Sequence, residues 1–279
     1  MKMMIGFAAG AAGVALVAPI ALGQEAINTD AATQPSTGHW QVRQQFRYEQ
    51  LDEDPTGLGR EVDEVTSKTL IAWGARRDLA FTLTVPVKYS ETSFGDGSDD
   101  DAFGLDDIVL QGKFRFFQND VGPVDTTRAS VIAGIEIPTG DDDFSSDGWN
   151  PMIGAVLTHI RGRHGFSLDA IWKFTTDGVA NPVQFGDSSA DALRYDGAYL
   201  FRLAPAEWQA ETHGAWYAVG ELNGRYETNG DHQIFFSPGV MYEARRWVFE
   251  ASVQIPVYQE LDHRLESEFV FVLGGRLLF

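Results

Sequence analysis

The sequence predicts an all-β fold: a transmembrane, antiparallel, up-and-down β-barrel of about twelve strands, preceded by a cleaved signal peptide. Three observations support it: the pattern of the last strand, the spacing of the connections, and the aromatic residues at strand ends. In the last strand apolar residues and glycine alternate with Glu268, Gly274 and Arg276, and the chain stops on Phe279. Since successive side chains of a strand point to opposite faces, one face is apolar. Such a closing strand with an aromatic end is typical of outer-membrane barrels.

The same alternation recurs along the chain. In the first predicted strand Trp40, Val42, Phe46 and Tyr48 share one face, and charged or amide side chains share the other. Each segment of this kind has the length of about 9–12 residues that a tilted membrane-spanning strand needs. The predicted strands cover residues 40–49, 62–73, 81–89, 108–116, 129–137, 152–160, 166–174, 193–202, 208–217, 233–242, 247–255 and 268–279.

The predicted connections alternate between short and long. The short ones are 74–78, 161–165, 204–207 and 243–246, with a longer one at 119–127, and we assign them to the periplasm together with both termini. The long ones, which become outer loops, are 50–60, 90–104, 139–150, 176–190, 222–231 and 259–267. A soluble sandwich or a lipocalin-like barrel would show the same alternation with its apolar face inward, but it has no reason to alternate loop lengths in this way.

Aromatic residues stand at both ends of the predicted strands. Amphipathic aromatic rings collect at the two membrane interfaces, so these positions predict two girdles. The interface residues are Trp40, Trp208, Trp247 and Phe279 at the inner side and Tyr48 and Tyr89 at the outer side.

The start of the chain has the three parts of a signal peptide. Lys2 supplies a positive charge, an apolar run follows, and Ala21-Leu22-Gly23 offers small residues for cleavage before Gln24. A transmembrane anchor is the alternative, but this run is short and rich in Ala and Gly. We therefore predict a signal peptide over 1–23, a polar periplasmic leader over 24–38, and a barrel in the outer membrane of a Gram-negative bacterium over 39–279. The leader either plugs the inner mouth or hangs free.

Composition limits the chemistry and the partners. The chain has no cysteine and a formal net charge of −19, which excludes disulfides and argues against nucleic acid. The acidic residues gather in the outer loops, where a solvated rim is a simpler interpretation than a Ca²⁺ or Mg²⁺ site. No cofactor and no metal site are predicted. The expected partners are outer-membrane lipid and lipopolysaccharide, a small-molecule solute, and the barrel-assembly machinery, which would recognise the strand that ends in Phe279.

If the apolar face meets lipid, the polar face lines a lumen. Hairpin symmetry puts Glu250 opposite Arg276, barrel closure brings Arg43 beside Arg276, Arg202 lies diagonal to Glu211, and Lys173 faces Asp196. A ring of charged side chains sets the selectivity of a pore, whereas a ladder of salt bridges would only fill a narrow barrel. The predicted lining residues are Arg43, Arg47, Lys113, Arg115, Lys173, Asp196, Arg202, Glu211, Glu250 and Arg276.

Catalysis is not predicted. An outer-membrane lipid hydrolase needs a nucleophile and a base within hydrogen-bonding reach of each other. His232 and Ser237 fall on opposite faces of one strand, and His263 has no adjacent serine, although Ser267 is near. His213 lies beside Glu211, where a histidine that lines the lumen is the simpler interpretation.

Two segments resemble motifs of a known family. Gly104-Leu105-Asp106-Asp107-Ile108, continued to Phe116, is similar to the glycine-aspartate strand of the "MetA-pathway of phenol degradation" transporter-like family, and Ile135-Glu136-Ile137-Pro138-Thr139-Gly140 is similar to its proline-threonine-glycine strand end. Asp106 departs from the pattern, which usually has glycine there. The resemblance implies an outer-membrane β-barrel that passes or takes up small aromatic, hydrophobic or anionic compounds by passive diffusion. A non-transporting structural or adhesive barrel is the second hypothesis.

Overall fold

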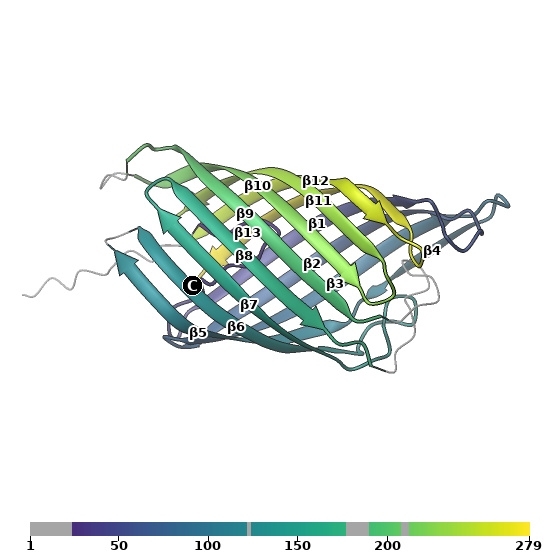
Figure 1. The fold of residues 1–279 in the computed structure, drawn as a ribbon, viewed down its shortest axis with the longest axis horizontal. Coiled ribbons are helices and arrows are strands. Elements are labelled where there is room, and N and C mark those ends of the chain that lie inside the picture. Colours follow the sequence, from purple (N-terminus) through teal and green to yellow (C-terminus); the bar gives the residue numbers. More distant parts are fainter. Residues whose placement is uncertain (1–23, 122–123, 177–189, 208–211) are drawn as a thin grey trace, which may run out of the picture.

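The computed structural model describes residues 24–121, 124–176, 190–207 and 212–279, which form one closed antiparallel sheet (Figure 1). The predicted signal peptide lies outside these residues. Within them, no helix is long and apolar enough to cross a membrane. The strands are β1 (Trp40–Asp52), β2 (Glu61–Arg76), β3 (Leu79–Ser93), β4 (Asp99–Leu105), β5 (Ile108–Val121), β6 (Asp125–Ile137), β7 (Asn150–Arg161), β8 (His164–Lys173), β9 (Ala192–Ala204), β10 (Gly214–Glu227), β11 (His232–Ala244), β12 (Trp247–Glu260) and β13 (Glu266–Leu278).

The barrel wall has twelve strand positions around its circumference, which we call staves, although the described residues contain thirteen strands. Strands that follow each other in the sequence pair with each other, and β1 pairs with β13 to close the ring. The exception is β3, which pairs with β5 along its first half and with β4 along its second half. Thus β4 and β5 are two halves of one stave, interrupted at Asp106 and Asp107. The predicted number of strands is confirmed, and β4 forms within a stretch predicted as loop.

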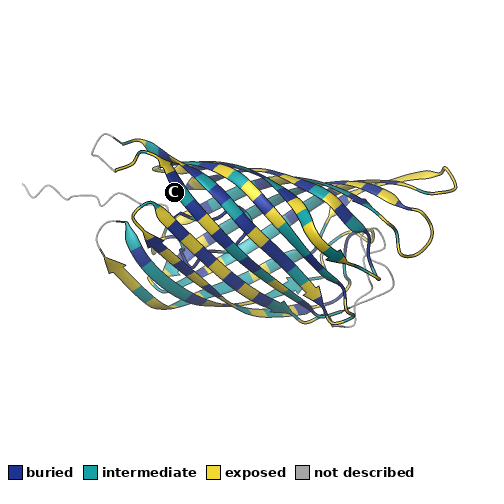
Figure 2. Ribbon diagram, turned by 45° about the horizontal axis from the view of Figure 1, so that its top comes forward, coloured by how far each residue is buried: buried dark blue, intermediate teal, exposed yellow. Residues whose placement is uncertain are grey.

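The apolar face of each strand points out of the barrel. Phe46, Leu168 and Phe271 are 50%, 56% and 43% exposed, whereas Gln45 and Glu250, on the opposite parity, are buried inside. Figure 2 shows the resulting alternation of buried and exposed residues along the strands that face the viewer. A soluble protein does not expose a continuous apolar belt of this kind. The soluble sandwich is therefore excluded, and the apolar exterior is the surface that faces lipid.

Connections of different length gather at the two ends of the barrel. We call one the turn end, because the short connections 77–78, 162–163 and 245–246 lie there beside Trp40 and Phe279. The other is the loop end, with connections 53–60, 94–98, 138–149, 228–231 and 261–265. Trp40, Trp247 and Phe279 are exposed at the turn end, while Tyr89 is exposed and Tyr48 half-buried toward the loop end. Trp208 lies outside the described residues.

The strand predicted at 208–217 is wrong in position. The observed strand, β10, runs from Gly214 to Glu227 and includes residues predicted as an outer loop. Its outward positions between Trp216 and Leu222 carry only Ala218 and Gly220. These small residues interrupt the run of large apolar side chains. The sequence of β10 therefore lacks the clear apolar–polar alternation that predicts a membrane-spanning strand.

Candidate solute chamber in the barrel lumen

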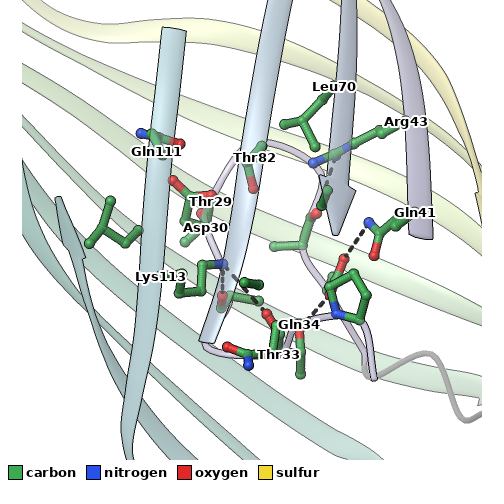
Figure 3. A pocket seen from close by; sticks show the side chains of 17 residues that line it. Thr29, Asp30, Thr33, Gln34, Gln41, Arg43, Leu70, Thr82, Gln111 and Lys113 are labelled. Carbon is green, nitrogen blue, oxygen red and sulfur yellow. Dashed lines mark hydrogen bonds between the residues drawn. The ribbon is translucent and has the colours of Figure 1, made fainter. Parts of the chain in front are cut away.

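The N-terminal segment, residues 24–38, enters the lumen at the turn end before β1 begins. Its small apolar side chains Ala26, Ile27, Ala31 and Ala32 are buried against the inner wall. Figure 3 shows the segment in close-up among Gln41, Arg43, Leu70 and Lys113, which project from the surrounding strands. The segment has no regular secondary structure, so its backbone polar groups need partners on the barrel wall.

Glu221 of β10 supplies the largest group of those partners. Its carboxylate accepts hydrogen bonds from the backbone N–H groups of Ile27 at 2.9 Å, Asn28 at 3.0 Å and Thr29 at 2.7 Å. The hydroxyl of Thr29 donates to the same carboxylate at 2.6 Å. Glu221 is buried, so one wall carboxylate holds three successive residues of the segment by charge-assisted hydrogen bonds.

A second group forms around Glu250 of β12. Arg276 of β13 and Arg43 of β1 both form salt bridges with this carboxylate, at 2.5 Å and 2.6 Å. Arg276 also donates to the backbone oxygen of Ala26 at 2.7 Å and pairs with Glu25 at 2.8 Å. The two arginines are direct partners in the closing ladder between β1 and β13. The guanidinium groups therefore link the barrel seam to the segment.

The opposite wall binds the second half of the segment. Lys113 of β5 donates to the backbone oxygen of Ala31 at 2.6 Å, and the N–H of Ala32 donates to the hydroxyl of Thr158 at 2.9 Å. The N–H of Asp30 donates to Asp169 of β8 at 2.6 Å. Contacts on β5, β7, β8, β10 and β13 thus hold the eight residues from Glu25 to Ala32 across the lumen.

Apolar lumen positions on neighbouring strands complete this docking surface. Ala26 and Ile27 share a buried cluster with wall residues of β9 to β13, and Ala32 packs in a second cluster with Ile132, Val156 and Ile171. Such apolar residues interrupt the polar parity of their strands. The wall members of the first cluster are Ala198, Leu200, Ala215, Tyr217, Val219, Met241, Val248, Val270 and Val272.

A chamber remains open on the loop side of the segment. It consists of two cavities, of about 450 Å³ and about 240 Å³, that share Arg47, Lys68 and Arg194 among their lining residues. The larger lies within the range of about 300–1,000 Å³ typical of small-molecule sites. A smaller cavity of about 70 Å³, drawn in Figure 3, lies beside the segment near Gln41 and Lys113. The lumen is therefore neither empty nor filled.

Most charged side chains of the chamber form ion pairs. Lys173 bridges Glu136 at 3.0 Å, and Lys88 bridges Asp106 at 3.0 Å. Arg194 pairs with three carboxylates: Asp30, Asp169 and Asp196. Arg225 and Arg264 pair with acids at the loop end: Glu227 and Asp231. Arg47 differs, since its charged end donates to the neutral amide of Gln254 at 2.6 Å.

Asp107 stabilises the loop-end rim of the chamber. It is buried at the interruption between β4 and β5, and its carboxylate accepts hydrogen bonds from backbone and side-chain groups of the 138–149 connection. Gly104 lies on the same side: a side chain there would come within 2.3 Å of Asp141, which accepts the N–H of Leu105. The two segments that resemble family motifs meet at this rim.

The structure places most of the predicted lining residues on the inner face of the barrel. Arg43, Lys113, Glu250 and Arg276 contact the N-terminal segment or its salt bridges, and Arg47 and Lys173 line the chamber. Asp196 lines the smaller chamber cavity. Arg202 is buried and donates to the backbone oxygen of Ala206. Arg115 donates to the backbone oxygen of Arg77 near the turn end, and Glu211 lies outside the described residues.

Three predicted pairings need correction. Glu250 is opposite Gly274 rather than Arg276, so its contact with Arg276 is diagonal. The hairpin is centred one position before His263, which the sequence does not reveal. Lys173 is opposite Ala192 and bridges Glu136 instead of Asp196. Arg202 is opposite Tyr217, because β10 begins later than predicted. The predicted closure of Arg43 beside Arg276 is confirmed.

Sequence reasoning missed Glu221, Lys68, Lys88 and Arg194 as lumen residues. Glu221 lies between the predicted strand at 208–217 and the predicted loop at 222–231, because the observed β10 begins later than predicted. Lys68 and Lys88 both lie on the inward parity of strands that had been identified, so the alternation was sufficient to find them. The apolar residues on the inward parity, such as Val270 and Val272, were the signal for an apolar partner inside the lumen.

Comparison with known proteins identifies the family. Residues 56–261 match the model of a family described as "Putative MetA-pathway of phenol degradation". The chain belongs to this family. The match covers β2 to β12, and it confirms the resemblance of the two motifs. No curated protein matches the sequence.

Solved structures of outer-membrane proteins resemble this chain. An outer membrane channel from Pseudomonas putida F1 aligns over 88% of this chain and 97% of its own, with a TM-score of 0.61 and 12% identity. The β domain of the Bordetella autotransporter BrkA aligns over 88% of this chain and 100% of its own, with a TM-score of 0.49 and 12% identity. The CymD monoaromatic hydrocarbon channel aligns over 89% of this chain and 90% of its own, with a TM-score of 0.43 and 9% identity. The alignment with the P. putida channel shows that this chain has the fold of an outer-membrane β-barrel.

Proposed function

We propose that this protein is an outer-membrane channel through which small solutes diffuse passively. The observation that carries the proposal is the chamber of about 450 Å³ that polar side chains line inside a closed apolar-coated barrel. A barrel that only served as a scaffold has no need of an internal cavity, because about eight strands already fill with side chains. Twelve staves leave room for a solute.

The comparisons support the same function. The family description names phenol degradation, and the P. putida relative is titled an outer membrane channel. Small aromatic, hydrophobic or anionic compounds are therefore the solutes we expect. The inward charged residues of the predicted set would then control which solutes pass, Arg47 and Lys173 from the chamber and Arg43 and Arg276 from the turn end.

We infer that residues 24–38 are a plug within this pathway. The segment lies between the chamber and the turn end, held by Glu221, Arg276 and Lys113. The plug is part of the mature protein if the predicted signal peptide ends at residue 23. A solute that crosses the membrane has to pass beside the segment or displace it.

A hydrolase is not part of the proposal. Three of the candidate side chains are hydrogen-bonded to other groups: His232 to Tyr195, His263 to Asp231, and Ser237 to Asn223. A structural or adhesive barrel is the alternative, and it would show no conductance. We also propose that the barrel-assembly machinery recognises β13, whose end at Phe279 is exposed to the membrane side.

Planar-bilayer recordings test the proposed function. The mature chain should give discrete conductance steps, and a variant that lacks residues 24–35 should give steps several times larger. Folding of the variant is checked by its heat-dependent migration in gels, which reports a closed barrel. Silence of both proteins, with the barrel intact, would contradict the channel. Equal conductance of both would contradict the plug alone.

A further inference from the structure

We infer that Arg47 and Lys68 form a binding subsite for the carboxylate of a small anionic solute. The inference rests on the proposed channel function and names the class of solute. Both side chains project into the chamber from paired strands, Arg47 from β1 opposite Thr66 of β2, two residues from Lys68. Both line each of the two cavities.

These two cations differ from the others in the chamber. Lys88, Lys173 and Arg194 each have a carboxylate within 4.0 Å. Within the described part of the chain, no carboxylate lies within that distance of the charged groups of Arg47 or Lys68. Burial of a cation without a counterion is costly, so a folded site normally supplies one. Here the cavity in front of the pair can supply it as a bound anion.

The surrounding charges strengthen this preference. Arg47 and Lys68 line the same two cavities, so their like charges repel each other. Glu49 also lines the chamber, but its carboxylate already accepts the hydroxyl of Ser267. A carboxylate that enters would lower this repulsion and pair with both cations.

The same cavity offers an apolar wall for the rest of the solute. Phe235, Leu51 and Leu265 line the smaller cavity together with Arg47 and Lys68. Phe235 also packs against the buried cluster that holds Ile27. A cationic pair on one side and an aromatic and aliphatic wall on the other fit a small aromatic carboxylate better than an inorganic ion, which has no apolar surface to bury.

Benzoate is the probe, with phenol as its neutral counterpart. Equilibrium dialysis with the purified full-length mature protein in detergent measures binding without reference to conductance. We expect saturable benzoate binding that Lys68→Gln and Arg47→Gln each weaken about tenfold, or about 1.4 kcal/mol. Phenol binding should change less than twofold. Lys68→Arg should retain benzoate binding, which separates charge from a general effect on folding.

Arg128→Gln is the matched control. It removes one inward positive charge near the turn end, where Arg128 pairs with Asp120, away from the chamber. Benzoate binding should be unchanged in this variant. Equal losses in Arg128→Gln and Lys68→Gln would overturn the subsite in favour of a general positive field, and so would absence of saturable binding. Benzoate binding by a protein that shows no conductance would support the subsite and contradict the channel function.

Discussion

The carboxylate of Asp107 accepts a hydrogen bond from the backbone N–H of Gly140 at 3.0 Å, which joins the glycine-aspartate segment to the proline-threonine-glycine segment. The same carboxylate accepts the N–H of Thr139 at 3.1 Å and two groups of Ser146 at 2.9 Å and 2.7 Å. One buried side chain therefore satisfies several donors of an irregular loop. Two motifs that lie about thirty residues apart are one structural unit.

Asp107→Asn should loosen the 138–149 connection. The asparagine NH₂ group would face donors that now have an acceptor, and each unsatisfied buried donor costs about 1–3 kcal/mol. Limited proteolysis should cut this loop at least ten times faster than in the wild type, while the barrel still migrates as folded. Asp142→Asn changes an exposed acid of the same loop and should leave the cleavage rate unaltered. Equal rates for all three proteins would show that Asp107 does not hold the loop.

Gly274→Ala should displace the Glu250 carboxylate. A Cβ at position 274 would lie 2.8 Å from Oε1 of Glu250 and 3.0 Å from the backbone oxygen of Gln44. Since Glu250 neutralises Arg43 and Arg276, its displacement leaves buried cations poorly paired, and we expect a loss of about 1–3 kcal/mol in unfolding free energy.

Gly220→Ala is the matched control for this change. Gly220 is also a strand glycine, but the nearest atom to an added Cβ lies 4.0 Å away, on Phe236. Urea unfolding followed by tryptophan fluorescence compares the two variants. The expectation is a lower midpoint for Gly274→Ala only. A similar midpoint for both variants would indicate that the Gly274 position has room to spare.

Glu221→Gln should release the first half of the N-terminal segment. An amide has one acceptor oxygen and no charge, so the hydrogen bonds to Ile27, Asn28 and Thr29 weaken, and hydrogen bonds to a charged group are worth about 1.5–3 kcal/mol. Protease should reach residues 24–35 at least tenfold faster, and the conductance should rise. Glu136→Gln breaks a lumen salt bridge with Lys173 outside the segment and serves as control. Unchanged protease access in Glu221→Gln would refute this anchor.

The 53–60 connection should stay ordered from pH 8 down to about pH 4, which is close to the ordinary pKa of an aspartate. Burial raises the pKa of Asp54, but hydrogen bonds from Arg60 and Thr56 outweigh this effect, so the pKa lies well below its usual value. A lowered folded pKa means that the stabilisation is present above the unfolded pKa and is lost as the pH falls through the folded one.

Hydrogen exchange of the Thr56 and Arg60 amides measures this order. Both amides donate to Asp54, at 3.1 Å and 3.2 Å. After correction for the intrinsic pH dependence, protection should stay constant between pH 8 and 5 in the wild type and be lost at all pH values in Asp54→Ala. Loss of wild-type protection near pH 6 would contradict the prediction. Salt should weaken the protection only slightly, since Arg60 is buried in this contact.

The sequence by itself determined the barrel. Strict alternation decides which face of each strand is apolar, and the alternating loop lengths together with the aromatic residues at both strand ends favour lipid as the partner of that face. The closing pair Arg43 and Arg276 followed from the same reasoning, since the first and last strands start and end at the same level. These features depend on the residue pattern and the ends of individual strands, so the sequence alone is sufficient to recognise them.

Only the tertiary structure decided what fills the lumen. The position of residues 24–38 depends on Glu221, Arg276 and Lys113, which lie far apart in the sequence and meet because the barrel closes. The register of each hairpin could not be predicted from the sequence either, because bulges and turn types set it. Glu250, for example, was predicted opposite Arg276 and lies opposite Gly274. Distances across a closed barrel are set by every stave at once, and no single segment of the sequence records them.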